Sequence, residues 1–341
     1  MDWAPGSPAY HGGLLALAAG VLLVAGVPFT RAADVLAERT GVGRALVGGV
    51  LLGAMTSLPG LVTSALAAWE GRPSFAVSNA LGGIAVQTAF IVVADLFHRH
   101  GNLEHAAASL PNLFQCLLTI GLLSVVVLGV ASPAVTWGSV HPASIALVVV
   151  YMAGLRLTQQ ARVRPMWRPN LDPATAAGAA DRPPKGAAGS IGGHWLRFVL
   201  LGLTVAAAGG LLARTGLGLA ETTGLSDSFV GGMMTSVASS LPELMVAIFA
   251  VRAGALTLAV ANIIGGNAFD ILIVAVCDVL APGSVYHAID PSTFFVAAET
   301  LLLTATLAAG LLHRQRAGIG FEGVVILGVY LTGAAILAFG F

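Results

Sequence analysis

Long apolar runs, separated by short polar segments, follow one another along most of the chain. Runs of membrane-spanning length are expected at about 12–37, 43–69, 73–97, 107–131, 141–159, 194–222, 226–251, 255–280, 293–312 and 321–340. About 20 consecutive apolar residues are long enough to cross a bilayer as an α-helix. The pattern therefore predicts an all-α integral membrane protein with ten transmembrane helices.

One polar segment divides these runs into two groups of five. Residues 160–193 are rich in Arg, Pro, Gly and Ala, a composition that cannot bury a core and is typical of a flexible linker. The expected organisation is thus a first five-helix unit at 1–159, a linker at 160–193, and a second five-helix unit at 194–341.

The two units repeat each other. An offset of 183 residues aligns 41–95 with 224–278 without a gap, and 18 of the 55 aligned residues are identical. The matches include SLP at 57–59 and 240–242, N-x-x-G-G at 79–83 and 262–266, and the aspartates Asp95 and Asp278. Because each unit has an odd number of helices, the second is expected to be inverted in the membrane, as in many secondary transporters.

Composition supports a membrane protein and excludes several other classes. The chain is 57% hydrophobic and only 9% charged, whereas soluble domains carry about 25% charged residues. Its formal net charge of zero gives no indication of a nucleic-acid partner. Basic residues gather in the loops on the side of 160–193, so the linker is expected in the cytoplasm and both termini outside. The preference for Arg over Lys, with abundant Ala and Gly, suggests a bacterial plasma membrane.

Two carboxylates stand out because they lie inside apolar runs. Glu243 ends the motif SSLPE and Asp270 ends ANIIGGNAFD, and neither motif contains Lys or Arg. An acid in the middle of a membrane helix costs about 2.5–3.5 kcal/mol to insert, so it is by default a functional candidate. Two unpaired acids at membrane depth predict a bound cation. Asp95 and Asp278 fall at predicted helix ends, where solvated carboxylates are expected.

Proline in each motif frees backbone carbonyls, and nearby hydroxyl, amide and carboxylate oxygens are ligands that Ca²⁺ and Na⁺ prefer. GAMTSLPGLVTS at 53–64 and SVASSLPELMVA at 236–247 resemble the two α-repeats of the sodium/calcium exchanger (cation/Ca²⁺ antiporter) superfamily. The resemblance covers about 12–97 and 194–280. It implies that the second, third, seventh and eighth helices enclose the ion site while the first and sixth slide across them. The cation ligands that it suggests are Glu243, Asp270, Ser239, Ser240, Thr56, Ser57, Gln87, Asn79 and Asn262.

Both repeats depart from that family pattern, the first more than the second. Gly60 replaces a glutamate, Gln87 replaces an asparagine, and Gly83 and Gly266 replace serines. One carboxylate fewer should change the number or selectivity of bound ions, because the ligand charge tunes such sites. The exchange stoichiometry of the family therefore does not carry over.

The sequence thus predicts a secondary active antiporter that exchanges Ca²⁺ for Na⁺ or H⁺ by alternating access. Two alternatives remain: a monovalent Na⁺/H⁺ exchanger on the same fold, and a transport-inactive membrane scaffold or sensor. An enzyme is not expected, because nucleophile–base and metal-catalysis motifs are absent from the sequence. No cofactor is expected, and the expected partners are inorganic cations and membrane lipid, with no nucleic acid and no indicated protein partner.

Overall fold

Helices make up almost all of the part of the chain that the structure describes, as the apolar runs predict. The computed structural model describes residues 6–40, 55–98, 102–163, 191–313 and 319–340. Within these residues there is no strand, and eight helices are long and apolar enough to cross a membrane, or nine with one bent pair. They are α1 (Pro8–Thr40), α5 (Pro73–Asp95), α7 (Leu110–Ala131), α8 (Pro142–Val163), α10 (Ile191–Thr223), α14 with α15 (Leu256–Asp270 and Leu272–Leu280), α16 (Pro291–Leu312) and α17 (Phe321–Phe339).

The predicted span at 43–69 is described only in part. Its second portion is the apolar helix α4 (Leu58–Trp69), whereas residues 41–54 lie outside the described part of the chain. Most of the expected linker, residues 164–190, also lies outside it. The count of ten helices therefore remains a prediction, while the all-helical membrane fold is confirmed.

The bent pair carries the SSLPE motif. A short helix α11 (Asp227–Phe229), a π-helical turn η2 (Val230–Thr235) and α12 (Ser236–Ser239) lead into α13 (Leu241–Arg252), with a bend of 42° at the junction. Pro242 lies in the first turn of α13, where it has no N–H to continue the backbone ladder across Ser240. Pro59 occupies the same place in α4, after Ser57. In neither case does the serine side chain cap its helix, so both hydroxyls remain available to the interior.

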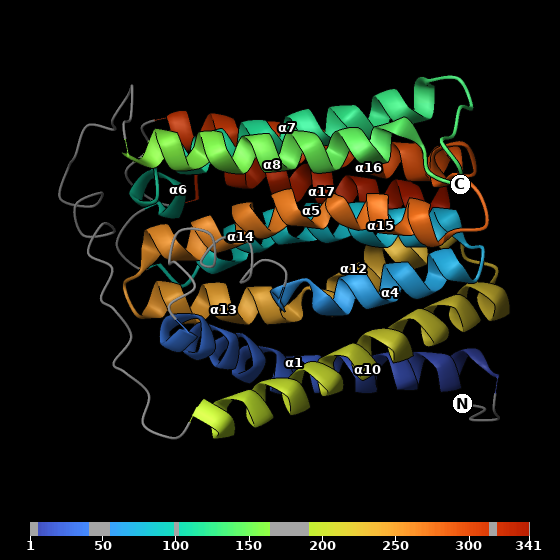
Figure 1. Ribbon diagram of the computed structural model, residues 1–341, viewed down its shortest axis with the longest axis horizontal. Helices are drawn as coiled ribbons and strands as arrows, with labels where there is room; N and C mark the ends of the chain where they lie inside the picture. The colour runs from blue at the N-terminus through green and yellow to red at the C-terminus, as the bar shows by residue number, and fades with distance from the viewer. Residues whose placement is uncertain (1–5, 41–54, 99–101, 164–190, 314–318, 341) are drawn as a thin grey trace.

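The helices form layers around α5 (Figure 1). Helices α7 and α8 pack together on one side of the molecule, α1 and α10 pack together on the other, and α4, α13, α14 and α15 lie between. Helix α5 is enclosed by α4, α13, α14, α15, η2, α16 and α17, so nearly all of its residues are buried. A polar group on α5 is consequently hidden from lipid and must find its partners within the protein.

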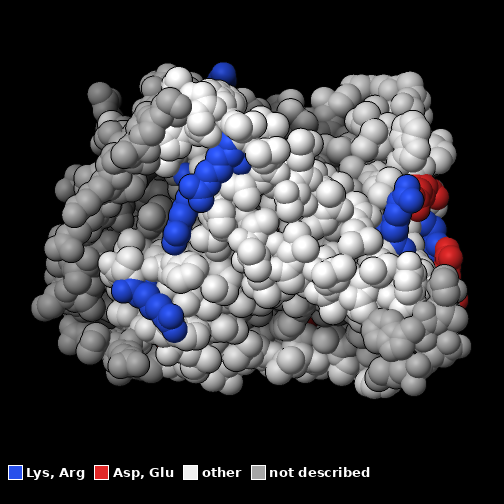
Figure 2. Space-filling model, turned by 90° about the horizontal axis from the view of Figure 1, so that it is seen from below, with Lys and Arg blue, Asp and Glu red and all other residues white. Residues whose placement is uncertain are grey.

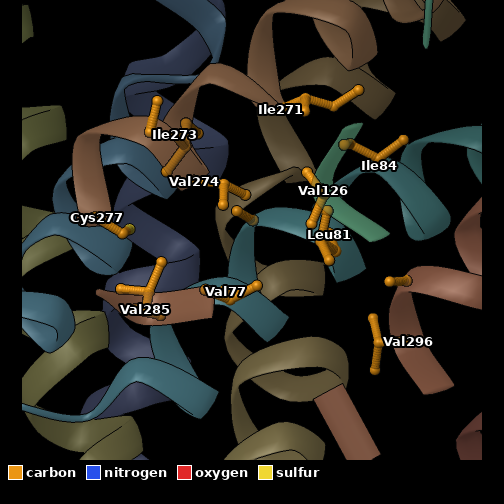
Figure 3. Packing of buried hydrophobic residues seen from close by; sticks show 14 of the residues in the cluster. Val77, Leu81, Ile84, Val126, Ile271, Ile273, Val274, Cys277, Val285 and Val296 are labelled. Atoms are coloured by element: carbon orange, nitrogen blue, oxygen red, sulfur yellow. The ribbon is translucent and has the colours of Figure 1, made fainter. Parts of the chain in front are cut away.

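Apolar packing holds α5 in this position. Figure 3 shows Val77, Leu81 and Ile84 of α5 among side chains of α7, α15 and α16. The contact with η2 is closer still, because Gly82 meets the backbone of Gly232 with no room for a Cβ. Small residues of this kind allow the backbones of membrane helices to approach each other. The interrupted helix formed by η2, α12 and α13 is therefore fixed directly against α5.

Equivalent contacts recur in the two repeats at the offset found in the sequence. Gly26 of α1 packs on Pro242, and Gly209 of α10 packs on Pro59, in both cases without space for a Cβ. The offset of 183 residues relates both members of these pairs. The two repeats therefore share contacts as well as sequence. Each long outer helix, α1 or α10, crosses the proline break of the opposite repeat.

On the face shown in Figure 2, acidic and basic side chains gather at one end, and further basic side chains lie on the other half of the described surface. At the end where α10 finishes, Arg72 forms ion pairs with Glu221 at 2.7 Å and Asp227 at 2.5 Å. The broad white surface between the ends is what a lipid-facing wall requires.

Candidate cation site

The predicted site residues converge on a small cavity between the two proline breaks. Its volume is about 10 Å³, which is close to the room needed by one water-sized particle. The walls come from the segment before α4 and from α4, α5, α12, α13, α14 and α15. The lining residues are Ser57, Gly60, Asn79, Ala80, Gly83, Gln87, Ser239, Ser240, Glu243, Asp270 and Ile273.

The two carboxylates predicted from the sequence face this cavity together. Glu243 and Asp270 are 2% and 3% exposed, and no Lys or Arg of the described residues lines the cavity. Gln87 Nε2 donates a hydrogen bond of 2.8 Å to Asp270 Oδ2 and lies 3.4 Å from Ser240 Oγ. An amide from the first repeat thus contacts an acid of the second, and the 183-residue offset relates these two positions.

Several oxygen atoms around the cavity lack a hydrogen-bond donor among the described residues. They are Glu243 Oε2, Asp270 Oδ1, Gln87 Oε1 and Ser57 Oγ, all of them buried. A buried polar atom without a partner costs about 1–3 kcal/mol, so four such atoms in one place need an explanation. Oxygen ligands around a space for one small particle suit a hard cation such as Ca²⁺ or Na⁺.

Hydroxyl groups complete the wall. Thr56 lies beside the Glu243 carboxylate and Ser57 beside that of Asp270, although Ser57 Oγ makes no hydrogen bond of good geometry. Ser239 Oγ donates to the carbonyl of Ser236 at 3.1 Å, which leaves its lone pairs facing inward. These hydroxyl residues surround both acids, as the resemblance implied, and their role as ligands remains a prediction.

Asn79 lines the cavity but has both ends of its amide engaged. Its Nδ2 donates to Ser64 Oγ at 2.9 Å and to the Gly60 carbonyl at 3.3 Å, while its Oδ1 accepts from Thr235 Oγ1 at 2.7 Å. This network joins α4, α5 and η2 beside the proline break. The contacts give Asn79 a bracing role.

Asn262, the repeat equivalent of Asn79, lies elsewhere. It lines a separate groove with Arg31 and Phe249, between α1 and the pair α13–α14, and its buried Nδ2 has no partner in the described part of the chain. Of the nine residues expected at the site, the structure therefore brings the two acids and six others together and places Asn262 outside their cavity.

The glycines that replace family side chains leave usable space. A Cβ at Gly60 or Gly83 would lie 3.7 Å from the hydroxyl of Ser239 or Ser240, and one at Gly266 would lie 3.5 Å from Gln87 Oε1. These are ordinary van der Waals separations. The backbone could therefore accommodate a side chain at each of these glycines. Their absence changes which polar groups face the cavity and does not change the packing.

A second group of acids was not anticipated. Asp95 is buried and accepts a hydrogen bond of 2.7 Å from the N–H of Leu103, which begins the short helix α6 (Leu103–Ala106). Glu104 and Glu322 are buried nearby, and Glu322 Oε1 accepts from Asn102 Nδ2 at 2.8 Å. Burial, together with Asp95 and Glu322, raises the pKa of the Glu104 carboxyl to about 8.

Asp278 is also buried, so the expectation of solvated acids at both helix ends was wrong. Its carboxylate accepts from the N–H groups of His141 and Val285 and from the Ser144 hydroxyl. In each repeat the connecting segment folds back over the aspartate. The identical register of Asp95 and Asp278 in the sequence was the available signal for this shared capping role.

Comparison with known proteins agrees with this arrangement. The family model described as sodium/calcium exchanger protein matches residues 10–158 and 193–339, which is nearly the whole chain. The protein belongs to the sodium/calcium exchanger family. Its relatives include the putative antiporter CaxA of Alkalimonas amylolytica, 27% identical over 312 residues, covering 89% of this chain and 91% of that protein. The inner membrane protein YrbG of Escherichia coli (strain K12) is 28% identical over 308 residues, covering 90% and 88%.

Solved structures of exchangers share the fold. The H⁺/Ca²⁺ exchanger CAX superposes with a TM-score of 0.66 at 14% identity, covering 96% of this chain and 85% of that one. The sodium-calcium exchanger NCX_Mj superposes with a TM-score of 0.60 at 18% identity, covering 96% and 98%. This chain is thus an integral membrane transporter of the exchanger fold.

Proposed function

We propose that this member of the family is a secondary active antiporter that exchanges Ca²⁺ for H⁺ or Na⁺ by alternating access. The observation that carries the proposal is the pair Glu243 and Asp270, facing one small buried cavity whose walls carry unpaired oxygens. Two carboxylates neutralise one Ca²⁺ completely. The names of the similar proteins, an H⁺/Ca²⁺ exchanger and a sodium-calcium exchanger among them, support the same ion.

Protons are the counter-ion that the cavity favours. Within the described residues no third His, Cys, Asp or Glu joins the two acids in a group able to hold a metal. Two protons replace one Ca²⁺ on two carboxylates without leaving charge behind, because like-charged buried acids favour the protonated form when no cation is present. Several Na⁺ ions would need more ligands and more room than a cavity of about 10 Å³ offers.

Uptake of ⁴⁵Ca²⁺ by proteoliposomes under an imposed H⁺ or Na⁺ gradient tests the proposal. We expect uptake to follow the H⁺ gradient and to be abolished in Glu243→Gln and Asp270→Asn. Glu299→Gln is the matched control, because Glu299 is also buried within a membrane helix but lies on α16, away from the cavity. Undiminished uptake in both amide variants would exclude the site.

Gly60 favours a second candidate, a monovalent Na⁺/H⁺ exchanger, because it removes a carboxylate that family members carry. The same vesicles distinguish it: ²²Na⁺ uptake driven by H⁺, without Ca²⁺ uptake, would replace our proposal. Vesicles in which neither ion moves under any gradient would leave the inactive scaffold or sensor.

We further propose a bacterial plasma membrane as the location, with both termini outside and 160–193 in the cytoplasm. The support is the distribution of basic residues between the loops. Protease treatment of intact cells should spare the linker and cleave it only after the cells are opened.

A further inference from the structure

A groove on the outer surface of the transporter combines two hydrogen-bond donors with an apolar floor. It has a volume of about 170 Å³ and lies between α1 and the pair α13–α14. The lining residues are Val27, Thr30, Arg31, Val246, Phe249, Ala250, Leu258 and Asn262. None of these residues lines the cation cavity, so the groove is a separate feature.

The donors in the groove have no partners among the described residues. Asn262 Nδ2 is buried and makes no hydrogen bond there. Arg31 is exposed with its guanidinium 5.6 Å from the centre of the Phe249 ring, and no carboxylate in the described ranges pairs with it. A cation and an amide that line the same groove suit an anion with several acceptor oxygens, and the planar guanidinium matches phosphate particularly well.

The depth of the groove matches a lipid headgroup. Asn262 lies about 9 Å along α14 from its first residue. Phe29, two residues before Arg31, stacks on Phe198 near the start of α10 at 5.2 Å. The groove therefore opens toward the end of the bundle where α10 begins and α1 ends (Figure 1). The half-exposed Leu258 and the Phe249 ring continue it along the hydrophobic wall.

The mirrored position in the other repeat is closed. Arg214 and Asn79 are the equivalents of Arg31 and Asn262, but the amide of Asn79 is fully engaged. Thr63, the equivalent of Val246, donates a hydrogen bond of 2.9 Å to the carbonyl of Gly209 and ties α4 to α10. Phe75, the equivalent of Leu258, is completely buried. The vacant amide donor is thus found on one side alone.

We propose that this groove binds the phosphate headgroup of an anionic phospholipid from the leaflet on the linker side. Arg31 and Asn262 hold the phosphate, and one acyl chain lies against Val27, Val246 and Leu258. The bound lipid bridges α1 to α14 and thereby supplies the connection that Thr63 makes on the opposite side. A net negative headgroup is preferred, because no side chain that the structure describes forms an ion pair with Arg31.

Lipid binding to the delipidated full-length protein tests this assignment. Native mass spectrometry would measure the affinity for phosphatidylglycerol and, in parallel, for phosphatidylcholine. We expect phosphatidylglycerol to bind more tightly, Arg31→Gln to weaken it about tenfold through loss of a charged hydrogen bond, and Asn262→Leu to weaken it less. Arg214→Gln, the mirrored control, should bind like the wild type.

Equal affinity in wild type and Arg31→Gln would overturn the proposal. Equal losses in the Arg31 and Arg214 variants would also overturn it, because they would show a general attraction of lipid to basic side chains. Displacement of phosphatidylglycerol by millimolar inorganic phosphate would show that the groove recognises the phosphate alone, which contradicts a lipid site. None of these outcomes depends on whether the protein transports Ca²⁺.

Discussion

The two repeats give the cavity the same backbone but very different charges. Each repeat supplies a proline break and a helix that crosses it, and each contributes two central positions at the same offset. In the first repeat these positions are Gly60 and Gln87, and in the second they are Glu243 and Asp270. All of the negative charge therefore comes from one half, and the other half contributes an amide that donates to Asp270. Symmetry of fold does not require symmetry of chemistry.

This asymmetry limits what the transporter can bind. A third carboxylate would leave an excess charge beside one Ca²⁺ and would favour additional monovalent ions. With two, the cavity is neutral when it holds one Ca²⁺ or two protons. In the cation-free state the Gln87 amide also donates a hydrogen bond to Asp270. A carboxylate at position 87 could donate one only if it were protonated.

The largest expected effect comes from moving the acid between repeats. Glu243→Gly alone should lower ⁴⁵Ca²⁺ uptake on the order of 100-fold, because one positive charge of the buried Ca²⁺ is then left uncompensated. The double variant Gly60→Glu, Glu243→Gly restores the charge at the mirrored position, where a Cβ has room beside Ser239. It should recover a measurable part of the uptake. If the double variant is as inactive as the single one, the position of the charge matters more than the number of charges.

The second effect concerns the amide. Gln87→Glu has the same shape but replaces the hydrogen bond to Asp270 Oδ2 with two facing carboxylates. At pH 8 we expect a lower melting temperature without Ca²⁺ and a larger rise on adding Ca²⁺ than in the wild type. Thermal unfolding in detergent with and without Ca²⁺ measures both. A variant that Ca²⁺ stabilises no more than the wild type would show that Gln87 does not face the ion.

The sequence alone predicted much of this site, and the reason is the internal repeat. Because SLP and N-x-x-G-G recur in one register, the residues and their spacing are enough to place the two proline breaks. The resemblance to the exchanger family then assigned Gln87 and Asp270 to one site. The repeat was misleading for Asn79 and Asn262, which share a motif position but have different surroundings. Whether an amide turns inward depends on partners such as Thr235, which is distant in the chain. Burial of the two helix-end aspartates likewise depends on how the following loops fold back.

The third effect is a pH dependence of stability that we expect near Asp95, because the buried acid Glu104 lies beside it. Near Asp95 the buried Glu104 has a pKa of about 8, well above its unfolded value of 4.5. The folded protein therefore holds a proton that the unfolded chain releases, so this group makes stability fall as pH rises from about 4.5 to 8. Glu104→Gln should match the wild type near pH 4.5 and exceed its melting temperature by several degrees at pH 8. The exposed Glu70→Gln is the control; a constant difference at all pH values would contradict the assignment.

The smallest effect tests the hydrogen bond that joins α4 to α10 and has no counterpart between α13 and α1. Thr63 donates to the carbonyl of Gly209 at 2.9 Å and to that of Pro59 at 2.8 Å, whereas its equivalent Val246 cannot donate to Gly26. Thr63→Val keeps the shape and should lower the free energy of unfolding by about 1 kcal/mol, the usual contribution of one hydrogen bond. Val246→Thr, the mirrored control, should be close to neutral, because the Gly26 carbonyl already accepts a hydrogen bond of 3.1 Å from Thr30 Oγ1. If Thr63→Val has no effect, the hydroxyl does not hold α10 on α4, and both crossing helices are equally free to move.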